Sequence, residues 1–384
     1  GGKINLNFNQ NELLTSGISA IFGSDLGFEF QTSYILSNDG IFPKYVNVVI
    51  PGSSAYQKAY IQTIEPRPEN TVKDEIGNTL AIFKVNPRQE YEVKVKGNLK
   101  TFLKSQKKDV LTEAERAFYT KESKYWDKNN PNIKAKLSEI LQDKENQADD
   151  FDKARLIDKY VSNFLQFDYS RIEKNDFVRF GSITALNNPE KALASEFVDL
   201  ETALLRASNI PTRQVIGFAL KSGNGKPLSF SNQNLHTWLE FYDPNQGWVI
   251  SDPTWENTTA GSDFFAFNDL NHLALAFSST DDNFLLPTSI ETKIYDPELF
   301  EEKGAELDII VDKEILSGFP AKARVTVKNL GNAPFPLQPL SKLIPRKYYS
   351  NSQASNRSPP NLSLIHISEP TRLRRISYAV FCLK

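Results

Sequence analysis

The stretch LHTWLEFYDPNQGWVISDPT, residues 235–254, carries the pattern from which the rest of the chain can be placed. Segments rich in apolar and aromatic side chains span Leu235 to Tyr242 and Gly247 to Asp252, with turn-forming residues between them. This pattern predicts a β-hairpin. If Tyr242 pairs with residue 247 or 248, residue 236 lies opposite about residue 253. His236 and Asp252 then meet at the open end of the hairpin, where a carboxylate can orient an imidazole and stabilise its protonated form.

A helix and a further strand precede this hairpin. Apolar residues recur at helical spacing over about 195–207, which predicts a helix with one buried stripe. The stripe consists of Leu200, Ala203, Leu204 and Ala207. Ser195 is the expected N-cap, because acidic residues follow it in the first turn. The segment Asn209-Ile-Pro-Thr212 is expected to end the helix, and a strand is expected over 213–220.

Residues of about 150–257 resemble the transglutaminase-like core, which belongs to the papain-like superfamily of cysteine hydrolases. The motifs that carry the resemblance are Leu204-Leu-Arg-Ala207, Asn209-Ile-Pro-Thr-Arg213, Val215-Ile-Gly217, His236-Thr-Trp238, Gly247-Trp248 and Asp252-Pro-Thr254. Their order and spacing match over the whole core, with Asn209 where the family usually has Gly. The resemblance implies an α+β fold with helices packed on an antiparallel sheet. It also implies a Cys-His-Asp triad, in which His236 and Asp252 stand at the matching positions.

The position that the resemblance assigns to the nucleophile holds an alanine. The family's Cys stands at the start of the core helix, and counting back from Arg206 leads to Ala194. Alanine has no group to ionise, so it cannot form a covalent acyl intermediate. Ser195 is adjacent, but its side chain points about 100° further around the helix, and a serine needs stronger base assistance than a cysteine. The single Cys, Cys382, is the third residue from the end of the chain.

Other candidate residues receive structural roles. Trp238 and Trp248 are expected in the core or in the wall of a substrate cleft, to which Ser195 would also belong. Arg213 is expected to make a structural ion pair. His272 lies outside the hairpin pattern and is interpreted as structural, because paired ligands are missing from its sequence neighbourhood. We therefore predict no metal site, and with no phosphate-binding loop or dinucleotide fingerprint we predict no cofactor.

Flanking regions extend this core into a multidomain chain. The expected units are an N-terminal segment over 1–27, a β-sandwich domain over 28–105, a helical lead-in with the transglutaminase-like core over 106–300, a partial Ig-like β domain over 301–345, and a disordered or non-native tail over 346–384. In the sandwich, strands are expected at Tyr45–Ile50, Leu80–Val85 and Tyr91–Val95. In the Ig-like segment, they are expected at Leu307–Val311 and Ala323–Lys328.

Composition excludes some classes of function. The 384 residues carry 45 basic and 47 acidic side chains, a net charge of -2 that gives no support to nucleic-acid binding. The sequence has no apolar run of the roughly 18 residues that a membrane helix needs. It has no signal peptide and no Met, which is typical of a processed form or a fragment. The basic tail includes a stretch, 363–381, that resembles translated sequencing-adapter DNA, so we exclude it, with His366 and Cys382, from functional argument.

Three functions are consistent with these features. The first is a catalytically inactive domain that binds extended polypeptide in its cleft. The second is an active thiol acyl-transfer enzyme, a cysteine protease or transglutaminase, in a form with Cys in place of Ala194. The third is a structural or adhesion module of the cell envelope. The expected partner is polypeptide, with the oligomeric state open. Family members with flanking β modules are commonly extracellular or at the cell envelope, and we expect the same location here.

Overall fold

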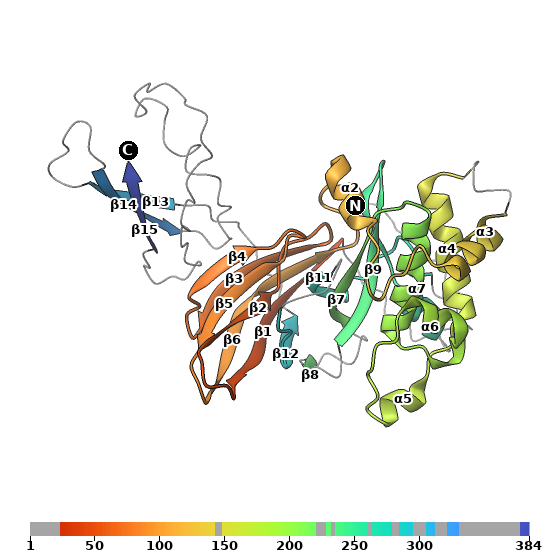
Figure 1. The fold of residues 1–384 in the computed structure, drawn as a ribbon, viewed down its shortest axis with the longest axis horizontal. Helices are drawn as coiled ribbons and strands as arrows, with labels where there is room; N and C mark the ends of the chain where they lie inside the picture. Colours follow the sequence, from red (N-terminus) through yellow and green to blue (C-terminus); the bar gives the residue numbers. More distant parts are fainter. Residues whose placement is uncertain are drawn as a thin grey trace, which may run out of the picture.

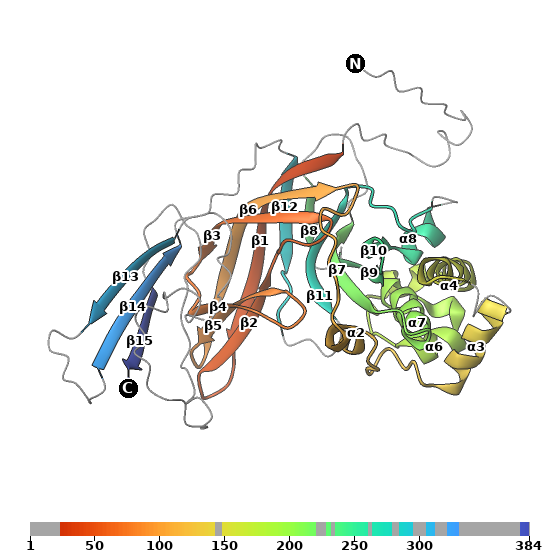
Figure 2. The same ribbon diagram turned by 90° about the horizontal axis from the view of Figure 1, so that it is seen from above.

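The structure, a computed structural model, describes residues 24–142, 148–219, 228–231, 235–259, 263–278, 284–294, 305–311, 321–329 and 377–383. Long strands fill the middle of the molecule, and the helices gather beyond one of its sheets (Figure 1). Figure 2 shows the same separation from above, with the core sheet between the long strands and the helices. The expected β-rich region therefore packs against the core sheet, on the side away from the helices.

Two sheets make up the N-terminal β-rich part. The larger one has the order β3 (Gln57–Glu65), β6 (Gln89–Phe102), β1 (Asp25–Asn38), β12 (Ser289–Ile294) and β8 (Leu228–Ser231). The smaller one has the order β2 (Lys44–Ile50), β5 (Thr79–Val85) and β4 (Asn70–Lys73). The strands expected near 45–50, 80–85 and 91–95 are present as β2, β5 and part of β6. Strand β12 was not expected, and its pairing with β1 brings the chain back to this sheet after the core.

The predicted hairpin lies within a four-stranded antiparallel sheet. Its order is β10 (Gly247–Ser251), β9 (Leu235–Asp243), β7 (Thr212–Ala219) and β11 (His272–Ser278). Trp248 pairs with Tyr242, as the turn sequence predicts. The longer helices of the core are α3 (Pro131–Leu141), α4 (Asp150–Phe164) and α7 (Ala194–Ala207). The shorter ones are α2 (Glu113–Tyr119), α5 (Tyr169–Glu173), α6 (Ser182–Asn187), η2 (Pro189–Lys191) and α8 (Pro253–Thr258).

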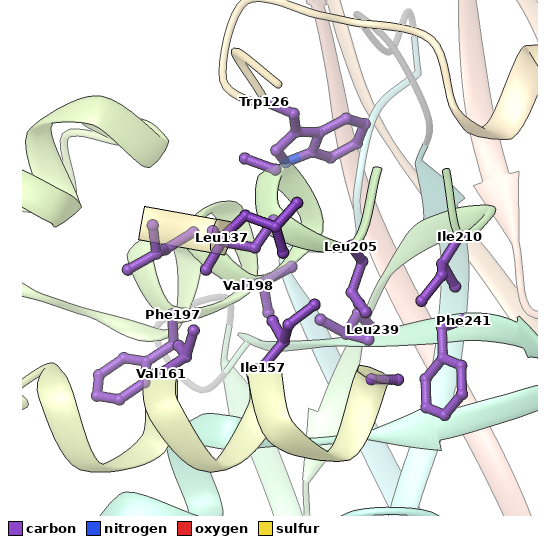
Figure 3. Packing of buried hydrophobic residues seen from close by; sticks show 14 of the residues in the cluster. Trp126, Leu137, Ile157, Val161, Phe197, Val198, Leu205, Ile210, Leu239 and Phe241 are labelled. Atoms are coloured by element: carbon purple, nitrogen blue, oxygen red, sulfur yellow. The ribbon is translucent and has the colours of Figure 1, made fainter. Parts of the chain in front are cut away.

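One hydrophobic cluster joins these helices to one face of the sheet (Figure 3). Ile157 of α4 and Val198 of α7 are fully buried in it. Leu239 and Phe241 of β9 belong to the same cluster, because residues two apart on a strand point to the same side. The α+β fold, with helices packed on an antiparallel sheet, is thus confirmed.

A second cluster joins the core sheet to the N-terminal sheets. Phe218 of β7 and Leu273 of β11 are buried together with residues of β1, β2 and β5. In addition, two buried amide side chains bind the outer edge of β11. The side chain of Gln57 binds both the N–H and the C=O of Ala274 at 2.9 Å, and that of Asn78 binds those of Phe277 at 2.7 and 2.8 Å. These amides satisfy an edge strand that would otherwise lack partners.

The sequence predicts the C-terminal end of α7 better than its N-terminal end. Its N-cap is Leu193 rather than Ser195, so the expected N-cap is wrong by two residues. Instead of a serine hydroxyl, the carboxylate of Glu196 accepts the Leu193 N–H at 2.9 Å and caps the helix from within its first turn. At the other end, Asn209 has φ of 59°, the left-handed conformation that Gly or Asn adopts after a helix. That geometry explains why Asn209 stands where the family usually has Gly.

The C-terminal strands form a separate three-stranded sheet. Strands β13 (Ala305–Val311) and β14 (Ala321–Asn329) contain the two expected segments and pair antiparallel. Strand β15 (Ser377–Leu383) pairs with the other side of β14. The Ig-like character of this region and the domain boundaries stay predictions, and His366 lies outside the described residues. Among the helices in the described ranges, none has the length and apolar character needed to cross a membrane.

Candidate active site

His236 and Asp252 meet where the sequence predicts. Strand β10 ends at Ser251, and Asp252 caps α8 by accepting the Trp255 N–H through Oδ1 at 3.0 Å. Its other oxygen, Oδ2, lies 2.6 Å from Nε2 of His236. Burial alone would raise the pKa of Asp252, but the charge and hydrogen bonds of the neighbouring imidazoles outweigh it and hold that pKa well below its usual range. Asp252 is therefore an anionic partner that orients His236 and leaves its Nδ1 for a second partner.

A second histidine shares the same carboxylate, which the sequence did not indicate. His272, the first residue of β11, places Nε2 2.9 Å from Asp252 Oδ2. Its Nδ1 lies 2.7 Å from Oδ1 of Asp269. Burial lowers the pKa of His272, yet the two carboxylates raise it to about 9 overall. The structural role assigned to His272 from sequence is thus incomplete, because this residue contacts the predicted site directly.

The start of α7 holds Ala194 and Ser195. Both are half-buried, and Ala194 is the first helical residue, where backbone N–H groups lack intrahelical partners. Ser195 donates from Oγ to Glu196 at 3.1 Å. The Glu196 carboxylate is buried and pairs with Arg171 at 3.1 Å. A side chain at position 194 would therefore experience the positive end of the helix dipole, with the neighbouring acidic charge already neutralised.

Comparison with known families identifies part of this chain. The family model described as the transglutaminase-like superfamily matches residues 136–253, which include α7, the hairpin and Asp252. Residues 136–253 form a transglutaminase-like domain. The resemblance inferred from the sequence motifs is thus confirmed, while the assignment of Ala194 to the nucleophile position stays a prediction.

Individual relatives cover different parts of the chain. The uncharacterized protein YebA of Bacillus subtilis is 31% identical over 124 residues, which are 30% of this chain and 16% of YebA. The chain thus spans about a sixth of the length of that relative. A Cytophaga hutchinsonii protein described as a candidate cysteine protease aligns with a TM-score of 0.51 at 13% identity, over 72% of this chain and 93% of that one. At this identity, the likeness supports the fold alone.

A further solved structure is the periplasmic domain of TgpA from Pseudomonas aeruginosa. It aligns with a TM-score of 0.34 at 13% identity, over 61% of this chain and 89% of that one.

Aromatic rings surround His236 and His272. Trp238 and Trp255 both lie 4.9 Å from the His272 ring, centroid to centroid, and 6.0 Å from the His236 ring. Trp238 is 2% exposed, whereas Trp255 is half-buried. These rings exclude water from the inner side of the pair, which strengthens its electrostatic interactions.

Trp248, the other expected cleft residue, lies in a different cluster from His236. It packs edge-on against Tyr119 and Tyr242. The guanidinium of Arg213 lies 4.1 Å from the Trp248 ring centroid and pairs with Glu240 at 2.6 Å. The ion pair expected for Arg213 is therefore confirmed, while a role for Trp238 or Trp248 in a substrate cleft stays a prediction.

A buried polar chain connects α7 to the strand that carries His236. Arg179 donates to Asp199 of α7 and, at 3.1 Å, to the side-chain oxygen of Gln214. Gln214 in turn donates to Thr237 at 2.7 Å. Burial raises the pKa of Asp199 to about 6, against the opposing effect of Arg179. Because Thr237 follows His236 directly, this chain fixes the helix relative to the histidine.

Buried carboxyl groups lie beneath Asp252. The Ser251 hydroxyl contacts Asp158 of α4 at 2.8 Å and Glu201 of α7 at 3.1 Å. Burial, followed by repulsion from neighbouring carboxylates, raises the pKa of both acids well above the usual range. A hydroxyl donates only one proton, so one of these contacts requires a protonated carboxyl group as the donor. One of the two acids is therefore protonated when both contacts are hydrogen bonds.

Proposed function

We propose that this transglutaminase-like domain binds extended polypeptide in its cleft without cleaving or cross-linking it. The observation that carries the proposal is Ala194 at the first position of α7. The chemistry of acyl transfer needs a nucleophile at that helix start, and alanine supplies none. Polypeptide is the substrate class that the resemblance implies, and a cleft without a nucleophile retains binding as its remaining activity. We also propose a location outside the cell or at the cell envelope, on the same resemblance.

The geometry around His236 supports this function. The imidazole is oriented by Asp252 at 2.6 Å, and its side chain is 12% exposed, so it is accessible from one side. Ser195 at the start of α7 and the half-buried Trp255 offer a hydroxyl and an aromatic surface to a bound chain. These are the group types by which clefts bind extended peptides, through hydrogen bonds and apolar contact.

Three assays on purified protein test the proposal. We expect no incorporation of a fluorescent amine into glutamine-containing polypeptide, no peptide hydrolysis, and saturable binding of labelled extended peptides by fluorescence polarisation. Ser195→Tyr should weaken peptide binding at least tenfold, about 1.4 kcal/mol, because the new ring occupies the start of α7. Lys134→Tyr, on the exposed side of α3, is the matched control and should leave binding unchanged. Catalytic turnover that His236→Ala abolishes would show that the domain is an enzyme as it stands.

The complete His236–Asp252 pair favours a second candidate. In a form with Cys at position 194, the same pair would act as base and orienting group for acyl transfer, by hydrolysis or by transglutamination. Protease and transglutaminase chemistry share this set of groups, so the reaction class depends on the acceptor rather than on the triad. The test is whether Ala194→Cys creates an activated thiol.

A further inference from the structure

Two histidines, His236 and His272, converge on one carboxylate oxygen. The chain has three histidines, and two of them, His236 and His272, contact Oδ2 of Asp252 at 2.6 and 2.9 Å. One ligand atom from each of the three residues lies within 4.8 Å of the others. We propose that His236, Asp252 and His272 form a binding site for a divalent transition-metal ion, with zinc as the preferred ion. This inference goes beyond the proposed function and does not depend on it.

A pair in which Asp252 only orients His236 does not require a second histidine. One carboxylate is sufficient to orient one imidazole, as in a nucleophile–base arrangement. His272 adds an imidazole whose side chain is 1% exposed, and burying such a group carries a desolvation cost. A metal ion explains the convergence, because two imidazoles and a carboxylate are a ligand set typical of zinc, whereas calcium and magnesium prefer oxygen alone.

The separations between Asp252 and the two histidines are slightly shorter than those expected between ligand atoms around a metal ion. Zinc-to-ligand distances of about 2.0–2.1 Å place tetrahedral ligand atoms about 3.3 Å apart. The separations of 2.6 and 2.9 Å between Asp252 and the two rings are hydrogen-bond lengths, so each must open by about 0.4–0.7 Å. Rotation of the His236 ring toward its exposed side opens the 2.6 Å separation, and a shift of the Asp252 carboxylate by about 0.4 Å opens the 2.9 Å one, so the buried strand β11 need not move.

Both buried ligands are held by further groups. Asp269 lies 2.7 Å from Nδ1 of His272, which directs the opposite nitrogen, Nε2, toward Asp252. The Trp255 N–H binds Oδ1 of Asp252 at 3.0 Å, which directs Oδ2 toward the histidines. A carboxylate behind a ligating imidazole is the usual second partner in zinc sites, where it fixes the ring and raises its basicity. The supporting contacts that a metal site needs are therefore present.

The surroundings suit an ion that enters from one side. Trp238, Trp255 and Phe264 pack around His272 and close the inner side of the cluster. His236 is 12% exposed, whereas the Asp252 and His272 side chains are each 1% exposed. Three protein ligands leave a fourth position of a tetrahedral ion for water or a substrate oxygen, on the side of His236.

Titration of the metal-free, EDTA-dialysed full chain with Co²⁺ tests the proposal. We expect one equivalent to bind with the visible absorption of a four- or five-coordinate nitrogen and oxygen site, to quench tryptophan fluorescence, and to be displaced by one equivalent of Zn²⁺. His272→Gln and His236→Gln should each weaken binding at least tenfold. Asp269→Asn should weaken it by about 10–100-fold, because it removes only the supporting carboxylate. His366→Ala and Cys382→Ser are the matched controls, since they remove the other histidine and the only thiol.

The results of these titrations either support or overturn the proposed metal site. If Co²⁺ and Zn²⁺ fail to bind the native chain, or if binding survives both glutamine variants but is lost in His366→Ala, the proposal is wrong. Circular dichroism of each variant shows whether it folds. His236→Gln, at the exposed side, remains decisive if His272→Gln does not fold. A rise in the melting temperature of the native chain with added Zn²⁺, absent in His236→Gln, would provide independent support.

Discussion

Replacing Ala194 by Cys tests whether the start of α7 activates a thiol. The substitution is made with Cys382→Ser, so that position 194 carries the only thiol. An unperturbed thiol has a pKa of about 8.5 and is about 3% thiolate at pH 7. At the first helical position, the exposed N–H groups and the helix dipole stabilise a thiolate by up to about 2 kcal/mol, which lowers the pKa by up to about 1.5 units, to about 7.

An imidazolium at hydrogen-bonding distance would lower it further. An opposite charge within about 4–6 Å shifts a pKa by about 1–3 units, which brings the expected value to about 4–6. At pH 6, a thiol of pKa 7 is about 9% ionised, whereas one of pKa 5.5 is about 75% ionised. The pH profile of iodoacetamide labelling, expressed as a fraction of its high-pH plateau, therefore separates dipole activation from pairing with His236.

Two matched variants show whether the helix dipole or His236 lowers the pKa of the thiol at position 194. Ser195→Cys places a thiol one residue along the same helix start, so it shares the dipole but points about 100° away. His236→Gln in the Ala194→Cys background removes the imidazolium and should raise the labelling midpoint by at least about one unit. The measurements contain EDTA, so that no metal occupies His236. If the thiols at 194 and 195 have the same midpoint, and His236→Gln does not change the midpoint of the thiol at 194, the reasoning that places a primed nucleophile site at Ala194 is refuted.

Three further predictions concern stability, measured by urea unfolding. Burial raises the pKa of Glu201 in the folded state above its value in the unfolded state. Its contribution to the free energy of unfolding is therefore fully present below the unfolded-state pKa and is lost as pH rises through the folded-state pKa. Glu201→Gln should therefore gain stability relative to the native protein between pH 5 and 8, and a pH-independent difference would contradict this. Arg213→Met or Glu240→Leu alone should cost about 3–5 kcal/mol and the double replacement much less, because each single change leaves a buried unpaired charge; additive costs would be inconsistent with a coupled pair. Gly217→Ala should cost about 1–3 kcal/mol, because a Cβ there meets the Leu273 carbonyl, and a neutral effect would show that β11 can shift.

The hairpin and the core helix could be predicted because their patterns are local. Apolar periodicity over 235–242 and the turn residues that follow fix the register within a few residues, and the register brings His236 to Asp252. The start of α7 could not be placed as well, since Ser195 and Glu196 both offer oxygen to the helix start. The longer Glu196 side chain reaches back to cap the helix, which a ranking of N-cap residues does not include.

His272 was missed for a different reason. Strand β11 is buried along its whole length, so it lacks the alternation that identifies half-buried strands. It pairs with β7 on one side, and Gln57 and Asn78 bind its outer edge from more than 190 residues away in the chain. The same holds for β12, whose partner β1 lies near the other end of the described chain. Contacts of this range have no local sequence signature, so the second histidine becomes visible only in three dimensions.

The energetics of the His236–Asp252–His272 cluster bear on whether the domain is only a scaffold. Asp252 and His272 are almost fully buried, and a third charged group, Asp269, supports them. Replacing a buried charged cluster by apolar side chains of similar volume is often neutral or stabilising, so folding alone does not require these residues. A domain that served only as structure would tolerate that replacement. The structure instead orients Asp252 and His272 by further hydrogen bonds and leaves His236 open on one side, an arrangement that favours a bound partner at this position, whether a polypeptide, a metal ion or both.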